Sequence, residues 1–283
     1  MHDDPPQLDP LIGAYYERVP EESRLEVGAF RLEEARTREL ILRHAPPPPA
    51  RVLDVGGAAG AYAFWLAEEG YDVSLIDAAP RLVALARSRN ERATRRLASC
   101  TVGDARALDE PDGSADVVLL LGPLYHLVDS QERARALVEA RRVLRARGVL
   151  IAAAISRWAS ALDGLSRNVL GDPAFARIVE RDLVDGQHRN PTDRVEYFTT
   201  AYFHRPEELR DDVGAVGLTV EAVYGLEGPG WILPDFMERW ADERGRDDLL
   251  RVARICESEA SLIGCSAHLL VVARNNDPDE SDA

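Results

Sequence analysis

Arg51-Val52-Leu53-Asp54-Val55-Gly56-Gly57-Ala58-Ala59-Gly60 is the stretch that decides the fold of this chain. A short apolar run containing one acid ends in small residues, and Ala61-Tyr62-Ala63-Phe64-Trp65-Leu66-Ala67 then has helical character. This order predicts a strand, a tight turn and the start of a helix. Glycine suits such a turn because it adopts positive φ and lets a ligand approach the backbone. The helix that follows points unpaired N–H groups at that ligand.

Strand-like and helix-like segments alternate after this corner. Strands are expected at residues 71–77, 100–102, 115–121 and 149–155, and helices from Pro80 and from Asp129 or Ser130. Such alternation predicts a parallel α/β sheet with right-handed crossovers. The run 115–121 is almost wholly apolar, as is typical of a parallel strand buried on both faces.

The segments outside this alternation predict additional structure around the sheet. A helix is expected at 30–44, stopped by Pro46-Pro47-Pro48-Pro49. Residues 156–200 are predicted to form two helices and a polar stretch, as an insertion over the sheet's working edge. A helix from Pro206, a strand at 218–224, a loop at 225–231, helices at 233–263 and a strand at 268–273 complete the expected elements. Residues 1–11 and 275–283 are predicted to be unstructured.

Composition narrows the functional classes. The chain has 283 residues, of which 46% are hydrophobic, and a net charge of −15, which disfavours nucleic acid as a partner. Its apolar runs do not reach the roughly 20 residues of a membrane span, and the N-terminus lacks the features of a signal peptide. Cys100, Cys256 and Cys265 have no metal-like spacing, which favours a cytoplasmic location and predicts no metal site.

The glycine corner favours a nucleoside ligand without a pyrophosphate. A dinucleotide fold requires Gly-x-Gly-x-x-Gly, whereas this chain has Gly56-x-Ala58-x-x-Ala61 in that register. The observed Asp54-x-Gly56-Gly57-x-x-Gly60 is a compact turn of an acid followed by glycines. It suits a ligand with an amino-acid portion that lies against the backbone.

Three acids close three successive predicted strands. Asp77, which lies 23 residues after Asp54, can accept both hydrogen bonds from a ribose diol and would repel a 2′-phosphate. Asp104 can accept a hydrogen bond from an adenine amino group. Because the carboxyl ends of parallel strands meet at one crevice, Asp54, Asp77 and Asp104 are expected to converge on one adenosyl-shaped cleft.

On these residues the sequence resembles the class I S-adenosylmethionine-dependent methyltransferases, best over residues 30–155. Residues 52–60 are similar to the family's first motif, with Ala58 in place of a glycine. The resemblance implies a Rossmann-like, doubly wound, seven-stranded sheet whose last strand is antiparallel, plus a helical cap. It also implies S-adenosyl-L-methionine as cofactor and S-adenosyl-L-homocysteine as product. The cofactor-binding residues expected are Arg31, Asp54, Gly56, Gly57, Ala58, Asp77, Ala78, Asp104, Ala105 and Leu121.

The expected chemistry is in-line methyl transfer to a small-molecule acceptor, for which the enzyme chiefly holds three atoms in line. His126 is the candidate base where the acceptor carries a proton that must be removed, and a packed histidine is the alternative. The candidate substrate contacts are Tyr16, Tyr125, His126, Tyr202, His204 and Trp231. Residues 1–30 are expected to form an N-terminal arm or cap, and 31–283 a methyltransferase domain with a substrate-cap insertion at about 156–200.

Two other functions remain open from the sequence. An RNA-nucleoside methyltransferase of the same fold would use the arginine clusters at 87–89 and 92–96. A non-catalytic module would bind S-adenosylmethionine without transferring a methyl group. The acceptor atom (O, N, S or C) and the oligomeric state are not determined by these motifs, because function depends on the pocket rather than on the fold.

Overall fold

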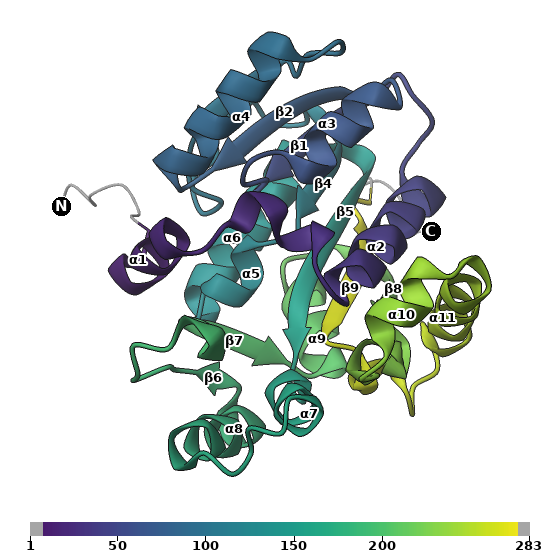
Figure 1. The fold of residues 1–283 in the computed structure, drawn as a ribbon. Coiled ribbons are helices and arrows are strands. Elements are labelled where there is room, and N and C mark those ends of the chain that lie inside the picture. The colour runs from purple at the N-terminus through teal and green to yellow at the C-terminus, as the bar shows by residue number, and fades with distance from the viewer. Residues whose placement is uncertain (1–7, 277–283) are drawn as a thin grey trace, which may run out of the picture.

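The computed structural model describes residues 8–276 and has a mixed sheet at its centre (Figure 1). Nine strands belong to the sheet, and seven of them form its main part in the order β3-β2-β1-β4-β5-β9-β8. These seven strands are β1 (Arg51–Val55), β2 (Asp72–Asp77), β3 (Ser99–Val102), β4 (Ala115–Leu120), β5 (Leu144–Ser156), β8 (Thr219–Gly225) and β9 (His268–Arg274). Strands β1 to β5 are parallel, and β9 runs antiparallel to both β5 and β8. The predicted fold class is confirmed.

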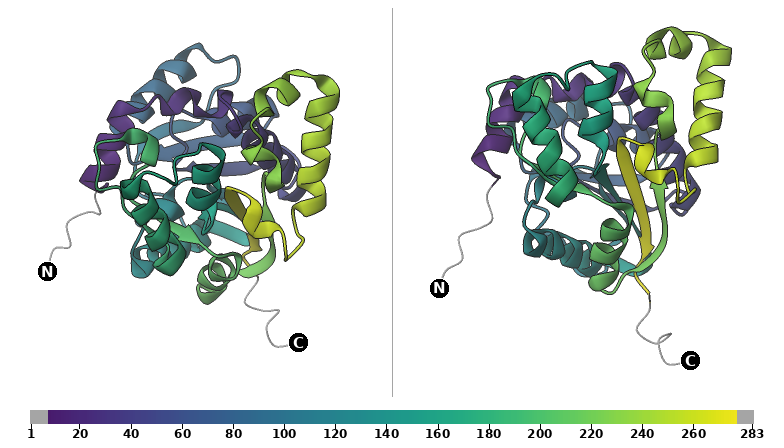
Figure 2. Two further views of the ribbon diagram at one scale, coloured as in Figure 1. Left: turned by 60° about the horizontal axis from the view of Figure 1, so that its bottom comes forward. Right: turned by 90° about the horizontal axis from the view of Figure 1, so that it is seen from below.

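Helices cover both faces of the sheet (Figures 1 and 2). Apolar side chains of α2 (Phe30–His44), α3 (Ala61–Glu68) and α4 (Pro80–Arg92) join one core, and those of α6 (Ser130–Val143) and α9 (Pro206–Ala215) join the other. Successive β1 residues alternate between the two cores, with Val52 in the first and Leu53 in the second. Both faces of the strand are therefore apolar, as burial on two sides requires.

The remaining elements lie around this core. The N-terminal segment contains α1 (Pro10–Arg18) and the 3-10 helix η1 (Glu21–Glu26), and the short helix α5 (Pro123–His126) follows β4. The inserted segment contains α7 (Ala159–Ser166), α8 (Pro173–Asp185), β6 (Gln187–His188), η2 (Val195–Tyr197) and β7 (Ala201–His204). Between β8 and β9 lie η3 (Gly228–Ile232), α10 (Phe236–Ala241), α11 (Glu243–Cys256) and η4 (Ile263–Cys265).

The inserted segment extends the sheet beyond the end of β4. Strand β4 pairs with β5 up to Leu120 opposite Ala152, and β7 then pairs in parallel with Ile155 and Ser156. Because β9 occupies the other edge of β5 at Ile155, β7 must continue the edge that β4 leaves. The insertion is thereby anchored at the carboxyl ends of the strands, where a doubly wound sheet binds its ligands (Figure 1).

Several boundaries differ from those expected. Residues 1–7 and 277–283 lie outside the described part, but Pro10 and Leu11, expected to be unstructured, begin α1. Asn275 is held by β5, since its backbone N–H donates to the carbonyl of Gly148 at 3.0 Å. The expected loop at 225–231 contains the 3-10 turn η3, and β6 and β7 add two strands to the expected seven.

Candidate active site

The turn after β1 is built around two residues that leave no space for side chains. A Cβ on Gly57 would lie 2.7 Å from Oδ2 of Asp54, and a Cβ on Gly56, whose φ is 75°, would lie 2.5 Å from Cδ of Pro123. Ala58 has a φ of 49°, in the left-handed region that favours glycine. Its N–H donates to Oδ2 of Asp77 over 2.8 Å, which fixes the turn against the end of β2.

A cavity of about 630 Å³ opens at this turn, and we call it the donor cavity. Its floor is made by the residues that follow β1, β2, β3 and β4, so the three acids expected to converge do line one cavity. The predicted residues found in its wall are Asp54, Gly56, Gly57, Ala58, Asp77, Ala78, Asp104, Ala105, Leu121, Tyr16, Tyr125 and His126. The volume lies in the range of small-molecule sites.

Two buried carboxylates give the donor cavity a negative floor. Asp54 is 1% exposed, and neither of its carboxylate oxygens has a hydrogen-bond partner within residues 8–276. Burial, reinforced by the charge of Asp77, raises the pKa of Asp54 to about 7. Asp77 accepts the N–H groups of Ala58 and Ala79, each at 2.8 Å, and burial raises its pKa despite these bonds. A cationic ligand with hydroxyl donors would satisfy both groups.

Asp104 is already engaged by an arginine. Nε of Arg106 donates to Oδ1 of Asp104 at 2.8 Å, and Nη2 donates to Oδ2 at 2.6 Å. Arg106 also forms an ion pair with Glu132. The carboxylate lies in the cavity wall as expected, but any adenine amino group would share it with Arg106.

Tyr16 and His126 form a hydrogen-bonded pair in the wall of the donor cavity. Nδ1 of His126 lies 3.2 Å from the carbonyl oxygen of Thr200, which only accepts, so Nδ1 carries the proton and Nε2 is an acceptor. The hydroxyl of Tyr16 donates to Nε2 over 2.7 Å. Burial lowers the pKa of His126 to about 4 and raises that of Tyr16 well above its usual value. His126, the predicted base, is thus a neutral imidazole, and the lone pair of its Nε2 already accepts a hydrogen bond from Tyr16.

A second cavity of about 590 Å³ adjoins the donor cavity, and we call it the aromatic cavity. The two cavities share four wall residues: Tyr16, Tyr125, Glu21 and Arg24. Trp231, a predicted substrate contact, lines the aromatic cavity, and its Nε1 donates to the carbonyl of Cys265 at 2.8 Å. Other rings in the wall come from the N-terminal segment and the insertion, among them Tyr15, Phe30, Tyr197 and Phe198.

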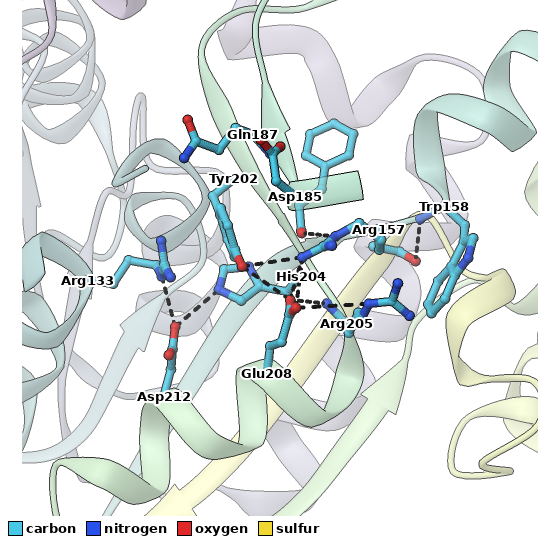
Figure 3. Close-up of polar contacts among 12 residues, drawn as sticks. Arg133, Arg157, Trp158, Asp185, Gln187, Tyr202, His204, Arg205, Glu208 and Asp212 are labelled. Atoms are coloured by element: carbon cyan, nitrogen blue, oxygen red, sulfur yellow. Dashed lines mark hydrogen bonds and ion pairs between the residues drawn. The ribbon is translucent and has the colours of Figure 1, made fainter. Parts of the chain in front are cut away.

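Tyr202 and His204 line neither cavity. Their side chains lie instead beside acidic residues of α9 (Figure 3). The hydroxyl of Tyr202 lies 3.3 Å from Oε2 of Glu208, and the fully buried His204 lies 3.5 Å from Oδ2 of Asp212. Side chains alternate along a strand, and Phe203, between them in β7, is the one that lines the aromatic cavity. Tyr202 and His204, expected to contact substrate, thus lie on the other face of β7 from Phe203 and line neither cavity.

Arg31 likewise lines neither cavity. Instead Arg24 reaches both, and Arg189, with Nη1 buried and unpartnered within residues 8–276, lines the donor cavity. Arg24 is bound by Glu33, at 2.7 and 3.0 Å, and by Glu21, at 2.9 Å. No local sequence pattern indicates that Arg24 and Arg189 line the cavities, because their positions depend on where η1 and β6 pack.

Comparison with known proteins relates part of this chain to methyltransferases. Residues 53–152 match the family described as methyltransferase domain. A glycine/sarcosine N-methyltransferase of Parasynechococcus marenigrum (strain WH8102) is 37% identical over 102 residues, which are 35% of this chain and 36% of that protein. The chain therefore spans about a third of the length of this curated relative.

Solved structures share the fold over most of the chain. An S-adenosylmethionine-dependent methyltransferase from Mesorhizobium loti has a TM-score of 0.58 and 19% identity, covering 86% of this chain and 99% of that one. The cyclase SpnF has a TM-score of 0.54 and 20% identity, covering 85% and 80%. At such identities the likeness is one of fold.

Residues 53–152 are therefore similar to a methyltransferase domain, and the fold is shared with solved structures named S-adenosylmethionine-dependent methyltransferases, whose namesake S-adenosylmethionine is a cation. The unpartnered carboxylate of Asp54 and the close-fitting Gly56–Gly57 turn are features that such a cationic ligand would use. No helix within residues 8–276 is long and apolar enough to cross a membrane.

Proposed function

We propose that this protein transfers a methyl group from S-adenosylmethionine to a small-molecule acceptor. The observation that carries the proposal is the shared wall: a cavity floored by Asp54, Asp77 and Asp104 adjoins a second cavity of about 590 Å³. The first suits the donor, and the second has room for an acceptor of small-molecule size. The relative named as a glycine/sarcosine N-methyltransferase also supports a small-molecule acceptor.

When bound, the cofactor supplies an activated methyl group on a sulfonium. Asp77 would hold the ribose hydroxyls, the Gly56–Gly57 turn the amino-acid portion, and Asp104 with Ala105 the adenine. Asp54 would compensate positive charge on the floor of the cavity. The contribution of the protein is then to bind and orient donor and acceptor and to exclude water.

In this proposal the cap consists of residues 1–30, of which the structure describes 8–30, and of the insertion at about 156–200. Tyr15 and Tyr16 of α1, with Glu21 and Arg24 of η1, contribute to the cavity walls. From the insertion, Arg189 lines the donor cavity.

Calorimetry with S-adenosylmethionine and S-adenosylhomocysteine tests the proposal. Asp77→Ala should lower donor affinity by at least about tenfold, because two ribose hydrogen bonds and the anchor of the Ala58 turn are lost. Asp72→Ala is the matched control, since Asp72 lies at the exposed start of the same strand. Absence of binding by the wild-type protein, or unchanged affinity in Asp77→Ala, would contradict the proposal. Donor binding without transfer to any small molecule or to transfer RNA would favour the non-catalytic module.

A further inference from the structure

The aromatic cavity has a wall chemistry that differs from that of the donor cavity. Rings from three parts of the chain line it: Tyr15 from α1, Phe198 from the insertion and Trp231 from η3. Tyr15 meets Phe198 edge to face with ring centroids 5.4 Å apart. The Nε1 of Trp231 is bound to a carbonyl, so the ring carbons of Trp231 remain for contact with a ligand. Such a wall favours an apolar, ring-bearing molecule.

The charged groups in and behind this wall have an excess of carboxylates. Glu21 and Glu227 line the aromatic cavity, and the buried Glu33 lies 2.7 Å from Arg24 and 3.6 Å from His268, which both belong to that wall. Burial alone would lower the pKa of His268, but Glu33 and Glu227 outweigh it and raise that pKa. Asp163 and Arg167 of the same wall pair with each other. Among the remaining buried and half-buried groups, even with His268 protonated, the carboxylates of Glu21, Glu33 and Glu227 face two cations, Arg24 and His268. One negative charge in a buried cluster therefore lacks compensation, which disfavours an anionic ligand and favours a cationic one.

Glu21 is the carboxylate placed to meet that cation. Its Oε1 accepts from Nε of Arg24 at 2.9 Å, whereas Oε2 has no partner in the part of the chain that the structure describes. Glu21 belongs to the wall that the two cavities share, beside Tyr16 and Tyr125. Burial raises the pKa of Glu21 in spite of Arg24, and the charges of Glu33 and Asp77 act in the same direction.

The cations of this wall are already bound to carboxylates. Arg24 holds both oxygens of Glu33, and Arg167 donates to Asp163 over 2.7 Å. A carboxylate on the acceptor would have to displace one of these pairs. The cation–π contact of Arg24 with Phe30, 4.8 Å from the ring centroid, shows that the aromatic wall already accommodates positive charge.

We infer that the aromatic cavity takes the methyl acceptor, and that the acceptor is an apolar, ring-bearing amine whose nitrogen lies at Glu21. This inference rests on the proposed function and names its substrate class. The amine enters as an ammonium, and one N–H proton passes to Oε2 of Glu21. The freed nitrogen lone pair then forms the new bond to the methyl carbon, and the electron pair of the carbon–sulfur bond goes to sulfur. The product is a methylated ammonium, and the proton on Glu21 leaves to solvent.

The test compares three probes of one shape in the presence of S-adenosylhomocysteine: naphthylethylamine, naphthylethanol and naphthylpropionate. Calorimetry should give the amine at least about tenfold higher affinity than the alcohol, and the carboxylate should bind more weakly than both. Glu21→Gln should abolish the preference for the amine. Glu26→Gln, the same change at an exposed position of η1, should leave the preference intact.

Equal affinities for amine and alcohol, strongest binding of the carboxylate, or no binding of the amine would overturn the inference. In each case intact binding of S-adenosylhomocysteine leaves the proposed function standing, whereas loss of that binding would count against the proposed function itself. The wild-type ranking needs no variant, so it decides the matter even where Glu21→Gln does not fold. Trp231→Leu should lower the affinity for all three probes by about the same factor, since it removes ring contact without changing the charge of the cavity wall.

Discussion

The hydroxyl of Tyr16 donates to Nε2 of His126 over 2.7 Å, joining two residues 110 positions apart. Tyr16 belongs to α1 and His126 to α5, directly after β4. The carbonyl of Thr200, in the insertion, lies 3.2 Å from the other ring nitrogen. One imidazole thus ties the N-terminal segment and the insertion to the end of the sheet.

Tyr16→Phe should lower the free energy of unfolding by about 1–3 kcal/mol, because Nε2 of His126 loses its donor while remaining buried. Tyr15→Phe is the matched control, since Tyr15 packs through its ring against Tyr16 and Phe198. Urea unfolding of both variants measures the difference. A loss in Tyr15→Phe as large as that in Tyr16→Phe would show that the hydrogen bond to His126 is not what anchors α1.

The affinity for S-adenosylmethionine should depend on pH through Asp54. Burial raises the pKa of Asp54 to about 7, and a bound cation favours the ionised form. Below that pH, binding must first release a proton, so affinity should rise by up to about tenfold per pH unit between about pH 5.5 and 7. Calorimetry across this range is the measurement. Asp54→Asn should bind more weakly and with a flatter profile, and an unchanged slope would contradict the assignment.

Asp54 should also make the stability of the ligand-free protein depend on pH. The direction of this dependence should be opposite to that of an ion-paired carboxylate. Its folded pKa lies above the value of 3.8 expected in the unfolded chain, so the folded state holds the proton more tightly. Stability should therefore decrease as the pH rises from about 4 to about 7. The difference in unfolding free energy between wild type and Asp54→Asn, measured at several pH values, isolates this contribution. A difference that does not vary with pH would contradict the raised pKa.

Ala58→Gly should stabilise the fold by about 0.5–1 kcal/mol. A residue with a Cβ costs about 1–2 kcal/mol in the left-handed region, where Ala58 lies, and glycine would relieve this strain. Glycine also gives the unfolded chain more conformational freedom, which offsets part of the stabilisation. Ala59→Gly is the control, since Ala59 is not among the positive-φ residues and should lose stability. Thermal unfolding compares the two variants. Equal destabilisation would show that Ala58 is unstrained.

Arg157→Leu should destabilise the junction of β7 and α9 by about 2–4 kcal/mol. The buried guanidinium of Arg157 donates to both oxygens of Glu208, at 2.9 and 2.7 Å, and to the carbonyl of Phe203 at 2.8 Å (Figure 3). Arg205→Leu, half-exposed and 4.0 Å from Glu208, should cost less than about 1 kcal/mol. Because Arg157 lines neither cavity, binding of S-adenosylhomocysteine by the folded variant should be unchanged. Weaker binding of S-adenosylhomocysteine by Arg157→Leu would show that the junction of β7 and α9 helps to position the donor cavity.

The sequence alone determined the sheet and the donor cavity. The turn at 54–60 and acids at the ends of three strands are local features, and parallel strands with right-handed crossovers bring their carboxyl ends to one edge. Asp54, Asp77 and Asp104 line one cavity for that reason, and nine residues from Asp54 to Leu121 were predicted for its wall without coordinates.

Only the tertiary structure decided what faces that cavity from outside the sheet. Whether Arg24 or Arg31 lines the donor cavity depends on how η1 packs. Whether Phe203 or its neighbours Tyr202 and His204 line the aromatic cavity depends on which face of β7 turns inward. A strand's alternation has two equivalent phases until a partner fixes one. The tie between Tyr16 and His126, and the carboxylate excess around Glu21, join segments more than a hundred residues apart, and no local pattern encodes such contacts.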